Sequence, residues 1–384
     1  MSVASYHGIG LMSGNSLDGL DICYAEFLGN PSSDVWSYRI IKVKTIDYSE
    51  KWWIRLKNSH RTSGPDLIKL HADFGRFIGQ EVKSFIESED IKELDFVACN
   101  GHTAFHQPGN GLSFSLGDGE RIVTFIDCPL VTNFRGKDIE LGGHGRPLVA
   151  MADPYLYQEY DFCLNLGGFA YMSFEGKAHD ICPCNMLLNY LARIQNESAL
   201  FDKDGELAKS GEILAPLRQQ LNSITYYKQS RPKSLCREWF DKEVLPLLDY
   251  KTWSIKDMLR TSVAHIIDEI CQAVELFLLE ATSVPAPRAG GKRKMLVTGG
   301  GAHNLFLVKC LTERLSTLDV KIVEYDRDEY TLDYKEALVY AFLGMRCLLG
   351  LPNISKDVTG GKDNIVAGSI HVPPHHSKPV LSIK

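Results

Sequence analysis

The sequence of 384 residues lacks the features that mark exported, membrane-spanning or nucleic-acid-binding proteins. No N-terminal apolar run is flanked as in a signal peptide, and no segment approaches the ~20 apolar residues that a transmembrane helix needs. Basic residues are fewer than acidic ones, 42 against 48, and the formal net charge of −6 argues against nucleic acid or an anionic membrane as a partner. We therefore expect a cytoplasmic protein with neither kind of partner.

Disulfide bonds are not expected either, although the chain has ten cysteines. Because no export signal precedes them, we expect reduced thiols. The pair in Cys182-Pro183-Cys184 has no second pair at zinc spacing, so metal binding there is the less favoured interpretation. What is present is the composition of a globular protein, 44% hydrophobic and 23% charged, with enough length for two domains.

The first informative stretch is a polar loop between two apolar segments. Residues 6–12 and 20–28 are predicted strands, and 36–46 would add a third strand to an antiparallel meander. Between the first two lies Gly14-Asn15-Ser16-Leu17-Asp18-Gly19. Its glycines tolerate positive φ and a close ligand, and consecutive N–H groups can form an anion-binding nest.

The side chains of this loop suit a nucleotide phosphate. Asn15 and Ser16 supply donors, and Asp18 and Asp21 are spaced as oxygen ligands of a Mg²⁺ that arrives with phosphates. Taken alone, however, the loop is more simply interpreted as a polar hairpin turn, because Gly, Asn, Ser and Asp are ordinary turn residues.

Four further elements are predicted before residue 150. Apolar residues at helical spacing indicate an amphipathic helix over about 65–88, and 94–99 is a short buried strand. A hairpin with its turn at 117–119 should lead into a strand at 121–126. The charged, Gly-rich segment 132–147 is predicted to be a long functional loop.

A second strand–glycine–strand pattern is the strongest internal signal. It occurs at 162–174 around Gly167-Gly168, roughly where a second half of the chain would begin. Helices are expected over about 185–195 and 257–281, and a strand at 295–298 runs into Gly299-Gly300-Gly301 before a helix that starts near Leu305. In one interpretation, this strand–triglycine–helix presents backbone N–H groups to an anion. In the other, it is only a tight connection between a strand and a helix. A strand at 320–325 and a helix at 335–349 follow.

Taken together, the motifs resemble the anhydro-N-acetylmuramic acid kinase family of the actin/hexokinase/Hsp70-like ATPase superfamily. The resemblance covers roughly residues 8–370 and rests on segments that occur in the family's order. These segments are the loop at 13–19, Asn133-Phe134-Arg135, 142–149, Asn165-Leu166-Gly167-Gly168, 180–185, 201–205, Pro232-Lys233-Ser234, Arg237-Glu238, 299–304 and Lys335-Glu336-Ala337.

The resemblance implies an α/β fold of two actin-like (ribonuclease H-like) domains with mixed sheets on either side of an ATP and sugar cleft. The expected boundaries are 1–127 with about 365–384 for the first domain and 128–364 for the second. It further implies a homodimer that uses ATP and Mg²⁺ on a small-molecule sugar.

The family's activity implies the chemistry. Water opens the anhydro ring of 1,6-anhydro-N-acetylmuramic acid, and O6 is phosphorylated to give N-acetylmuramic acid 6-phosphate in peptidoglycan recycling. Asp180 is then the candidate base that activates water, although it could instead cap the helix that begins near Asn185.

The implied ATP site takes residues from three segments: Gly14, Asn15, Ser16, Leu17, Asp18, Gly19, Leu20 and Asp21; Gly167 and Gly168; and Gly299, Gly300, Gly301 and Asn304. Asp18 and Asp21 are candidates for Mg²⁺, directly or through water.

The implied sugar site contains Arg135, Gly143, His144, Pro147 and Glu336. The fork of Arg135 could pair with the lactyl carboxylate of the sugar or with a phosphate, or form a surface ion pair with an acid at 138 or 140. Glu336 could equally be a first-turn helix acid.

Several departures from the family pattern leave a second function open. Asn15 stands where threonine is usual, Cys182 and Cys184 replace two glycines, Ile181 replaces threonine, and Asn189 and Tyr171 are also atypical. The alternatives to an active kinase are a diverged sensor that binds ATP or a muramyl ligand, and a kinase for another anhydro-sugar.

Overall fold

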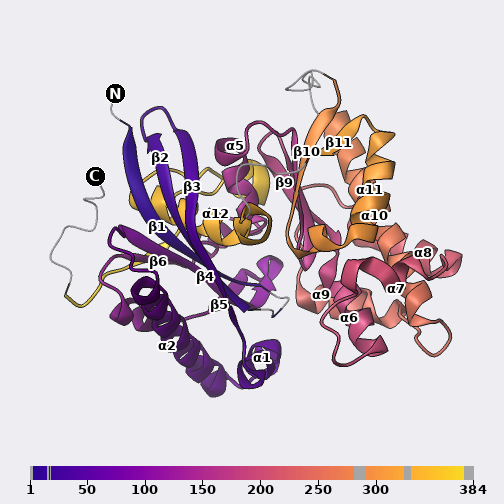
Figure 1. The fold of residues 1–384 in the computed structure, drawn as a ribbon, viewed down its shortest axis with the longest axis horizontal. Coiled ribbons are helices and arrows are strands. Elements are labelled where there is room, and N and C mark those ends of the chain that lie inside the picture. Colours follow the sequence, from indigo (N-terminus) through magenta and orange to yellow (C-terminus); the bar gives the residue numbers. More distant parts are fainter. Residues whose placement is uncertain (1–2, 15–16, 18, 281–290, 324–329, 376–384) are drawn as a thin grey trace. The chain divides into compact units, whose positions relative to one another are not determined.

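The computed structural model describes residues 3–14, 17, 19–280, 291–323 and 330–375. The chain divides into two compact units, which are Met1–Leu156 with Tyr334–Lys384, and Tyr157–Asp333. Figure 1 shows that each unit contains a β-sheet and its own helices.

The sheet of the first unit begins with the predicted antiparallel meander. Its strand order is β12-β6-β4-β1-β2-β3, with β5 on β4, and β4 runs parallel to both β1 and β6. The strands are β1 (Ala4–Ser13), β2 (Gly19–Asn30), β3 (Val35–Asp47), β4 (Phe96–Gln107), β5 (Leu112–Leu116), β6 (Leu130–Thr132) and β12 (Ser369–His371).

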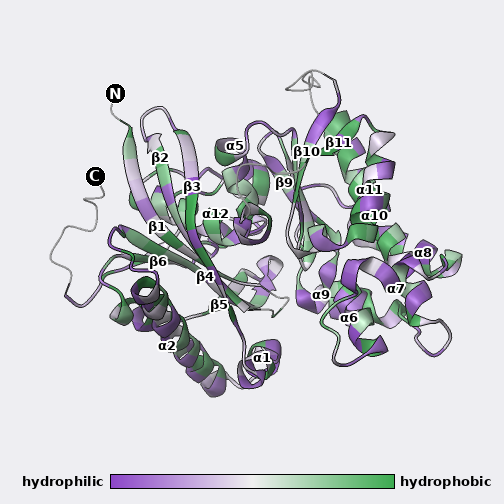
Figure 2. Ribbon diagram, in the orientation of Figure 1, coloured by the Kyte–Doolittle hydropathy of each residue, from purple (hydrophilic) through white to green (hydrophobic). Residues whose placement is uncertain are grey.

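The longest helix of the first unit is α2 (Gly64–Ser88), close to its predicted bounds. Ser63 caps its first turn by accepting a hydrogen bond from the backbone N–H of Asp66, and a stripe of apolar residues including Phe74 and Ile78 is buried. Hydrophobic and hydrophilic residues accordingly alternate along α2 in Figure 2. The other helices are α1 (Glu50–Lys57), α3 (Gly119–Ile122), α4 (Gly136–Glu140), α5 (Asp153–Leu156), α12 (Thr331–Leu348), which begins in the second unit, and α13 (Lys356–Thr359).

The sheet of the second unit repeats the same plan. Its order is β11-β10-β7-β8-β9, with β8 antiparallel to both β7 and β9, and β10 parallel to β7. Both β7 and β8 are buried along their whole length, in agreement with their mostly apolar sequences. The strands are β7 (Phe162–Leu166), β8 (Phe169–Phe174), β9 (Lys177–Pro183), β10 (Arg293–Thr298) and β11 (Val320–Val323).

The helices of the second unit pack around α10 (Ile255–Glu280), whose buried residues include His265 and Glu269 as well as apolar side chains. The others are α6 (Asn185–Gln195), α7 (Glu206–Lys209), α8 (Ala215–Asn222), α9 (Arg237–Glu243) and α11 (Leu305–Ser316). Short 3₁₀ helices occur in both units, at Ser59–Arg61, Pro108–Asn110, Val123–Phe125, Leu148–Ala152, Lys203–Gly205, Thr225–Lys228, Leu245–Leu247 and Gly300–His303. Among the described helices, none is long and apolar enough to cross a membrane.

The two sheets confirm the predicted α/β class with two actin-like units. Each begins with a three-stranded antiparallel meander and continues with two strands parallel to the first strand of the unit. The strand–glycine–strand patterns near 14 and 167 therefore open equivalent meanders.

Some local predictions were wrong. Residues 121–126 do not form a strand, because Asp118 caps a helical turn that buries Ile122 and Val123. The strand predicted at 94–99 continues to Gln107 by pairing with β5, and the loop predicted at 132–147 contains α4.

The compact units also differ from the domain boundaries expected at 127/128 and about 364/365. Residues 130–132 lie in the first unit because β6 pairs with β4 and with β12. The C-terminal helices α12 and α13 also belong to the first unit, except for the first residues of α12.

Candidate active site

The candidate phosphate loop of the first unit connects β1 to β2. Leu17 has a left-handed backbone with φ 61°, its N–H donates to the carbonyl of Gly14 at 3.3 Å, and its side chain is buried in the core. The turn is therefore anchored by an apolar side chain at its centre. Asn15, Ser16 and Asp18 lie outside the described residues.

Gly19, Leu20 and Asp21 belong to β2 rather than to the loop. A Cβ on Gly19 would come within 2.6 Å of a methyl group of Thr45 on β3, so close strand packing requires this glycine. Leu20 is buried in the core. Asp21 accepts a hydrogen bond from the Thr45 hydroxyl at 2.7 Å. Of the two candidates for Mg²⁺, Asp18 and Asp21, only Asp21 lies among the described residues.

Beneath this loop the structure shows a polar chain that the sequence did not assign to it. The hydroxyl of Tyr48 donates to Ser13 Oγ at 2.6 Å, and Ser13 Oγ lies 3.1 Å from His102 Nδ1. Burial lowers the pKa of His102 to about 4, so the imidazole is neutral near pH 7. Only the contacts between distant strands reveal this arrangement, because these residues are far apart in the sequence.

Arg135 is buried rather than placed on the surface. Its guanidinium donates to Thr103 Oγ1 at 2.7 Å and to the hydroxyl of Tyr340 at 3.3 Å, while its Nε has no acceptor among the described residues. The alternative ion pairs with Asp138 and Glu140 are not formed within the part of the chain that the structure describes. The site thus holds a buried cation with one unused donor.

Arg135, Arg146 and His144 all act on the buried imidazole of His106. The pKa of His106 is well below its usual value because the side chain is buried, and the charges of Arg146, Arg135 and His144 lower it further. The structure therefore brings His144 and Arg135 of the predicted sugar site into one electrostatic neighbourhood, together with His106, which the sequence did not place there.

The Gly-rich part of this segment is organised by Asp138. Its carboxylate accepts from Gly145 N–H at 2.8 Å and from the Thr359 hydroxyl at 2.7 Å, and a Cβ on Gly143 would collide with it. Gly143 therefore has a packing role that the sequence did not show. Pro147 follows a cis peptide bond.

Glu336 lies in the second turn of α12, because the helix begins at Thr331 and not at residue 335. The first-turn acid of α12 is Asp333, so this alternative for Glu336 was wrong. Burial raises the pKa of Tyr340, Arg135 opposes the rise, and Glu336 adds to it. Glu336 is thus close to the hydroxyl that holds Arg135.

Asp180 lies within β9 of the second unit and is fully buried. Its Oδ2 accepts from the backbone N–H of Leu235 at 2.9 Å, and its backbone carbonyl accepts from the hydroxyl of Tyr226 at 2.6 Å. Helix α6 begins after Cys184 without a side-chain cap, so the alternative of Asp180 as a helix cap was wrong. The carboxylate is held in one orientation by a neighbouring segment instead.

The glycine turn of the second unit and the triglycine come together. A Cβ on Gly299 would come within 2.7 Å of Asn165 Oδ1, and one on Gly301 would come within 2.7 Å of the Leu166 side chain. Asn185 connects them, because its amide donates to the Leu166 carbonyl at 2.8 Å and lies beside Gly300. Two segments that are over 130 residues apart therefore form one Gly-rich surface.

The remaining predicted ATP residues have identifiable structural roles. The carbonyls of Gly167 and Gly168 accept from the N–H groups of Asn185 and Cys184, at 3.0 and 2.9 Å, and so position the start of α6. Asn304 caps α11 by accepting from Leu307 N–H at 3.0 Å. These hydrogen bonds position the loops and leave the exposed backbone of Gly300 open to a ligand.

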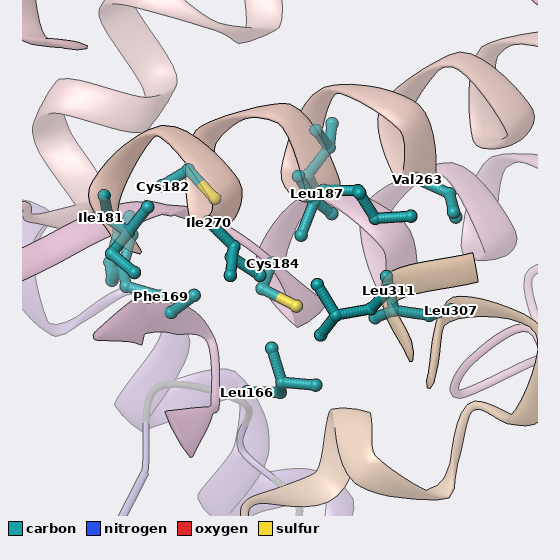
Figure 3. Close-up of a cluster of buried hydrophobic side chains, with 14 of the residues drawn as sticks. Leu166, Phe169, Ile181, Cys182, Cys184, Leu187, Val263, Ile270, Leu307 and Leu311 are labelled. Carbon is teal, nitrogen blue, oxygen red and sulfur yellow. The ribbon is translucent and has the colours of Figure 1, made fainter. Parts of the chain in front are cut away.

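Cys182 and Cys184 belong to the core. Figure 3 shows both thiols among buried side chains of β7, β8, α6, α10 and α11, including Leu166, Phe169 and Leu187. Both are free, buried cysteines whose side chains pack in the hydrophobic core. Among the described residues, no group of three or more His, Cys, Asp or Glu side chains is arranged to hold a metal ion.

Comparisons with known proteins agree with this geometry. The profile of the family described as anhydro-N-acetylmuramic acid kinase matches residues 6–373. A protein named anhydro-N-acetylmuramic acid kinase from Clostridioides difficile (strain 630) is 32% identical, with 97% of this chain and 100% of that protein covered. One of the same name from Francisella tularensis subsp. novicida (strain U112) is 29% identical, with 94% and 98% covered.

Among solved structures, the chain is similar to the activator of the 2-hydroxyisocaproyl-CoA dehydratase from Clostridium difficile with bound ADPNP. That match has a TM-score of 0.39 and 15% identity, and it covers 88% of this chain and 94% of the other. The match of the family profile to nearly the whole sequence shows that the chain belongs to the anhydro-N-acetylmuramic acid kinase family and is a sugar kinase.

Proposed function

We propose that this kinase couples the opening of the 1,6-anhydro ring of anhydro-N-acetylmuramic acid by water to the phosphorylation of O6 by ATP. The product is N-acetylmuramic acid 6-phosphate, an intermediate of peptidoglycan recycling. The observation that carries the proposal is Asp180, a buried acid that one segment holds by two hydrogen bonds, one to its carboxylate and one to its backbone carbonyl. Asp180 is the base that takes the proton of the attacking water.

The position of Asp180 in the second sheet supports this role. It pairs across the ladder with Tyr171, which follows Gly168 by three residues, so the acid and the glycine turn are about 10 Å apart along the strand. General-base catalysis depends first on geometry, and a carboxylate fixed by Leu235 meets that requirement. Burial also keeps bulk water from competing with the sugar for the base.

The Gly-rich surface of the second unit fits the phosphate chain of ATP. Side chains at Gly299 and Gly301 would meet Asn165 and Leu166, whereas the exposed backbone at Gly300 has room for an anion. Bound ATP supplies the phosphoryl group. Gly14, Asn15, Ser16, Leu17 and Asp18 of the first loop are further candidates for binding ATP, as the family resemblance implies.

Mg²⁺ is part of the proposal. Mg²⁺ is usually held by one or two carboxylates together with substrate phosphates, so the single described candidate, Asp21, is a sufficient protein ligand. Asp18 is the second candidate. We also propose that the protein is a cytoplasmic homodimer, which sedimentation in solution would test.

The sugar site follows from the buried cation. Arg135 is held by two neutral hydroxyl groups, so its charge is not neutralised by a carboxylate in the described residues. An anionic ligand that accepts from its Nε would supply that partner. The lactyl carboxylate of the muramyl sugar has the required charge, and we propose that it binds here beside His144.

The decisive experiment measures ADP release with ATP, Mg²⁺ and the anhydro-sugar. Turnover by the parent chain and a loss of at least 10³-fold in kcat for Asp180→Asn are expected, because the amide cannot take a proton. Asp319→Asn, an exposed residue of the same unit, is the matched control and should keep the parental rate. Near-parental turnover of Asp180→Asn would exclude this residue as the base.

Labelled water tests the coupling to ring opening. In H₂¹⁸O one labelled oxygen should appear at C1 of the product, and its absence would exclude the hydrolytic step. Tight binding of the sugar without any turnover would instead favour the sensor alternative.

A further inference from the structure

The segment from Tyr226 to Leu235 contacts Asp180 at both of its ends. The Tyr226 hydroxyl donates to the backbone carbonyl of Asp180 at 2.6 Å, and the Leu235 N–H donates to the carboxylate at 2.9 Å. One attachment fixes the strand and the other fixes the side chain. The position of the carboxylate therefore depends on the conformation of this segment.

Lys233 closes the segment on itself. Its ammonium group donates to the carbonyls of Tyr226 and Tyr227, at 3.3 and 3.5 Å, and lies 4.7 Å from the centre of the Tyr226 ring. Only 7% of Lys233 is exposed, so these interactions form in a low-dielectric environment. The lysine thus joins the residue that holds the backbone of Asp180 to the stretch that holds its carboxylate.

The titratable groups around Lys233 come from three parts of the chain. Glu269 on α10 is the acidic neighbour, Arg231 precedes Lys233 in its own segment, and Cys182 lies on β9. Burial lowers the pKa of Lys233, Glu269 raises it, and Arg231 lowers it again. His265 of α10 lies 3.8 Å from Glu269. The site is therefore a buried lysine with one acidic neighbour and two backbone carbonyls.

We propose that Lys233 is a positioning residue for Asp180, which acts by holding the segment from Tyr226 to Leu235 in the conformation that aligns the base. The inference rests on the proposed function, because it has a catalytic consequence only if Asp180 is the base. Lys233 does not touch the substrate in this role. Its loss should lower kcat and leave the KM values for ATP and sugar unchanged.

The main test is Lys233→Met, which keeps the length of the side chain and removes the charge. We expect kcat to fall by about 10- to 100-fold, in the range of a 1 Å misplacement of a catalytic group. Both KM values should stay within about two-fold. Lys228→Met in the same segment, where the lysine is exposed, is the matched control and should retain parental kcat.

A double-substitution cycle separates positioning from general stabilisation. Tyr226→Phe removes the hydroxyl that binds the Asp180 carbonyl, and we expect it to lower kcat by about 3- to 10-fold. If both residues act through Asp180, the double variant loses less than the product of the two single losses. Calorimetric titration with ADPNP gives the fraction of folded sites, to which each kcat is normalised.

Parental kcat in Lys233→Met, or purely multiplicative losses in the cycle, would overturn the inference. If Lys233→Met does not fold, Tyr226→Phe decides alone, and parental kcat in that variant would overturn the inference. Asp180→Asn keeps the two proposals apart. Its activity tests the base itself, whereas an inactive Asp180→Asn beside a fully active Lys233→Met rejects only the positioning role.

Discussion

At the scale of single residues, Glu269 stands out among the buried charges of the second unit. Asp180 accepts a backbone hydrogen bond, and Lys233 donates to two carbonyls. Glu269 is 94% buried, with His265 at 3.8 Å, and burial raises its pKa to about 7 although Lys233 opposes the rise. Folding therefore favours the protonated form of this acid.

The raised pKa predicts a specific dependence of stability on pH. The folded chain keeps the proton of Glu269 up to about pH 7, whereas the unfolded chain releases it near the ordinary value of 4.5. Because the folded state binds more protons between these values, the contribution of Glu269 to the free energy of unfolding falls as pH rises from about 4.5 to about 7. Glu269→Gln cannot ionise and should be spared this loss.

Urea unfolding of the parent and Glu269→Gln at pH 5 and pH 8 measures the effect. Relative to the parent, the variant should gain about 1–3 kcal/mol of stability between the two values. For the control Glu275→Gln, which replaces an exposed acid on the same helix, the difference in free energy of unfolding from the parent should be the same at pH 5 and pH 8. A difference that shrinks with rising pH in Glu269→Gln would contradict the raised pKa.

Single residues were only partly predictable from sequence. Asp180 and Arg135 could be proposed as site residues from motifs, but their partners could not be predicted, because Leu235 and Tyr340 are 55 and 205 positions away. Helix periodicity likewise predicts α10. It does not predict which groups interact with His265 and Glu269 on the buried face of that helix. Long-range contacts decide these environments.

At the scale of elements, the connection from β9 to α6 contains the clearest departures from the family pattern. Cys182 and Cys184 are fully buried, and both lie in the core that surrounds α10. The backbone of Cys184 has φ −116° and ψ −96°, a negative φ that does not need glycine. The cysteine side chains therefore fill space in the core, and the backbone between β9 and α6 accommodates them.

Restoring glycine at these two positions tests that interpretation. Cys182→Gly and Cys184→Gly should each lower the free energy of unfolding by about 1–3 kcal/mol, because each leaves a cavity and adds backbone freedom to the unfolded chain. The turnover per folded molecule should stay within about three-fold. Urea unfolding and ADP release measure the two quantities.

The alanine variants Cys182→Ala and Cys184→Ala serve as controls, because they remove the thiol and keep the backbone restraint. They should lose less stability than the glycine variants. A rise of ten-fold or more in turnover on restoring glycine would show instead that the cysteines slow the reaction, as the sensor alternative requires.

Elements with a clear period were predictable, and elements created by pairing were not. The meanders and α2 follow from alternation and helical spacing. The strand β5 and the short helix α3 were missed because β5 depends on β4, and α3 depends on a cap by Asp118 and on packing of Ile122. Local sequence alone does not contain those contacts.

At the scale of the whole molecule, the path of the chain explains why the compact units differ from the domain boundaries expected from the sequence. The chain leaves the first unit after Leu156 and returns at Tyr334, in each case next to or within a helix. No glycine- or proline-rich linker marks either crossing, so composition gives no signal there. Instead, residues of α5 and α12 beside the two crossings are joined by an ion pair.

This ion pair, between Asp153 of α5 and Lys335 of α12, gives the final prediction. The two charged atoms are 2.8 Å apart, and the side chains are 5% and 1% exposed. Removing one partner breaks this buried ion pair, which typically destabilises a protein by about 3–5 kcal/mol. Lys335→Met and Asp153→Asn should each lower the free energy of unfolding by about that amount.

The double variant distinguishes an ion pair from two independent contributions. Because the double variant removes both members of the pair, Asp153→Asn with Lys335→Met should lose less stability than the sum of the single losses, by at least about 1 kcal/mol in urea unfolding. Lys356→Met, an exposed lysine of the first unit, is the control and should change stability by less than about 0.5 kcal/mol. Additive losses would mean that the two side chains stabilise the crossings separately. A sub-additive loss means that one buried interaction holds together the two segments through which the chain leaves and re-enters the first unit.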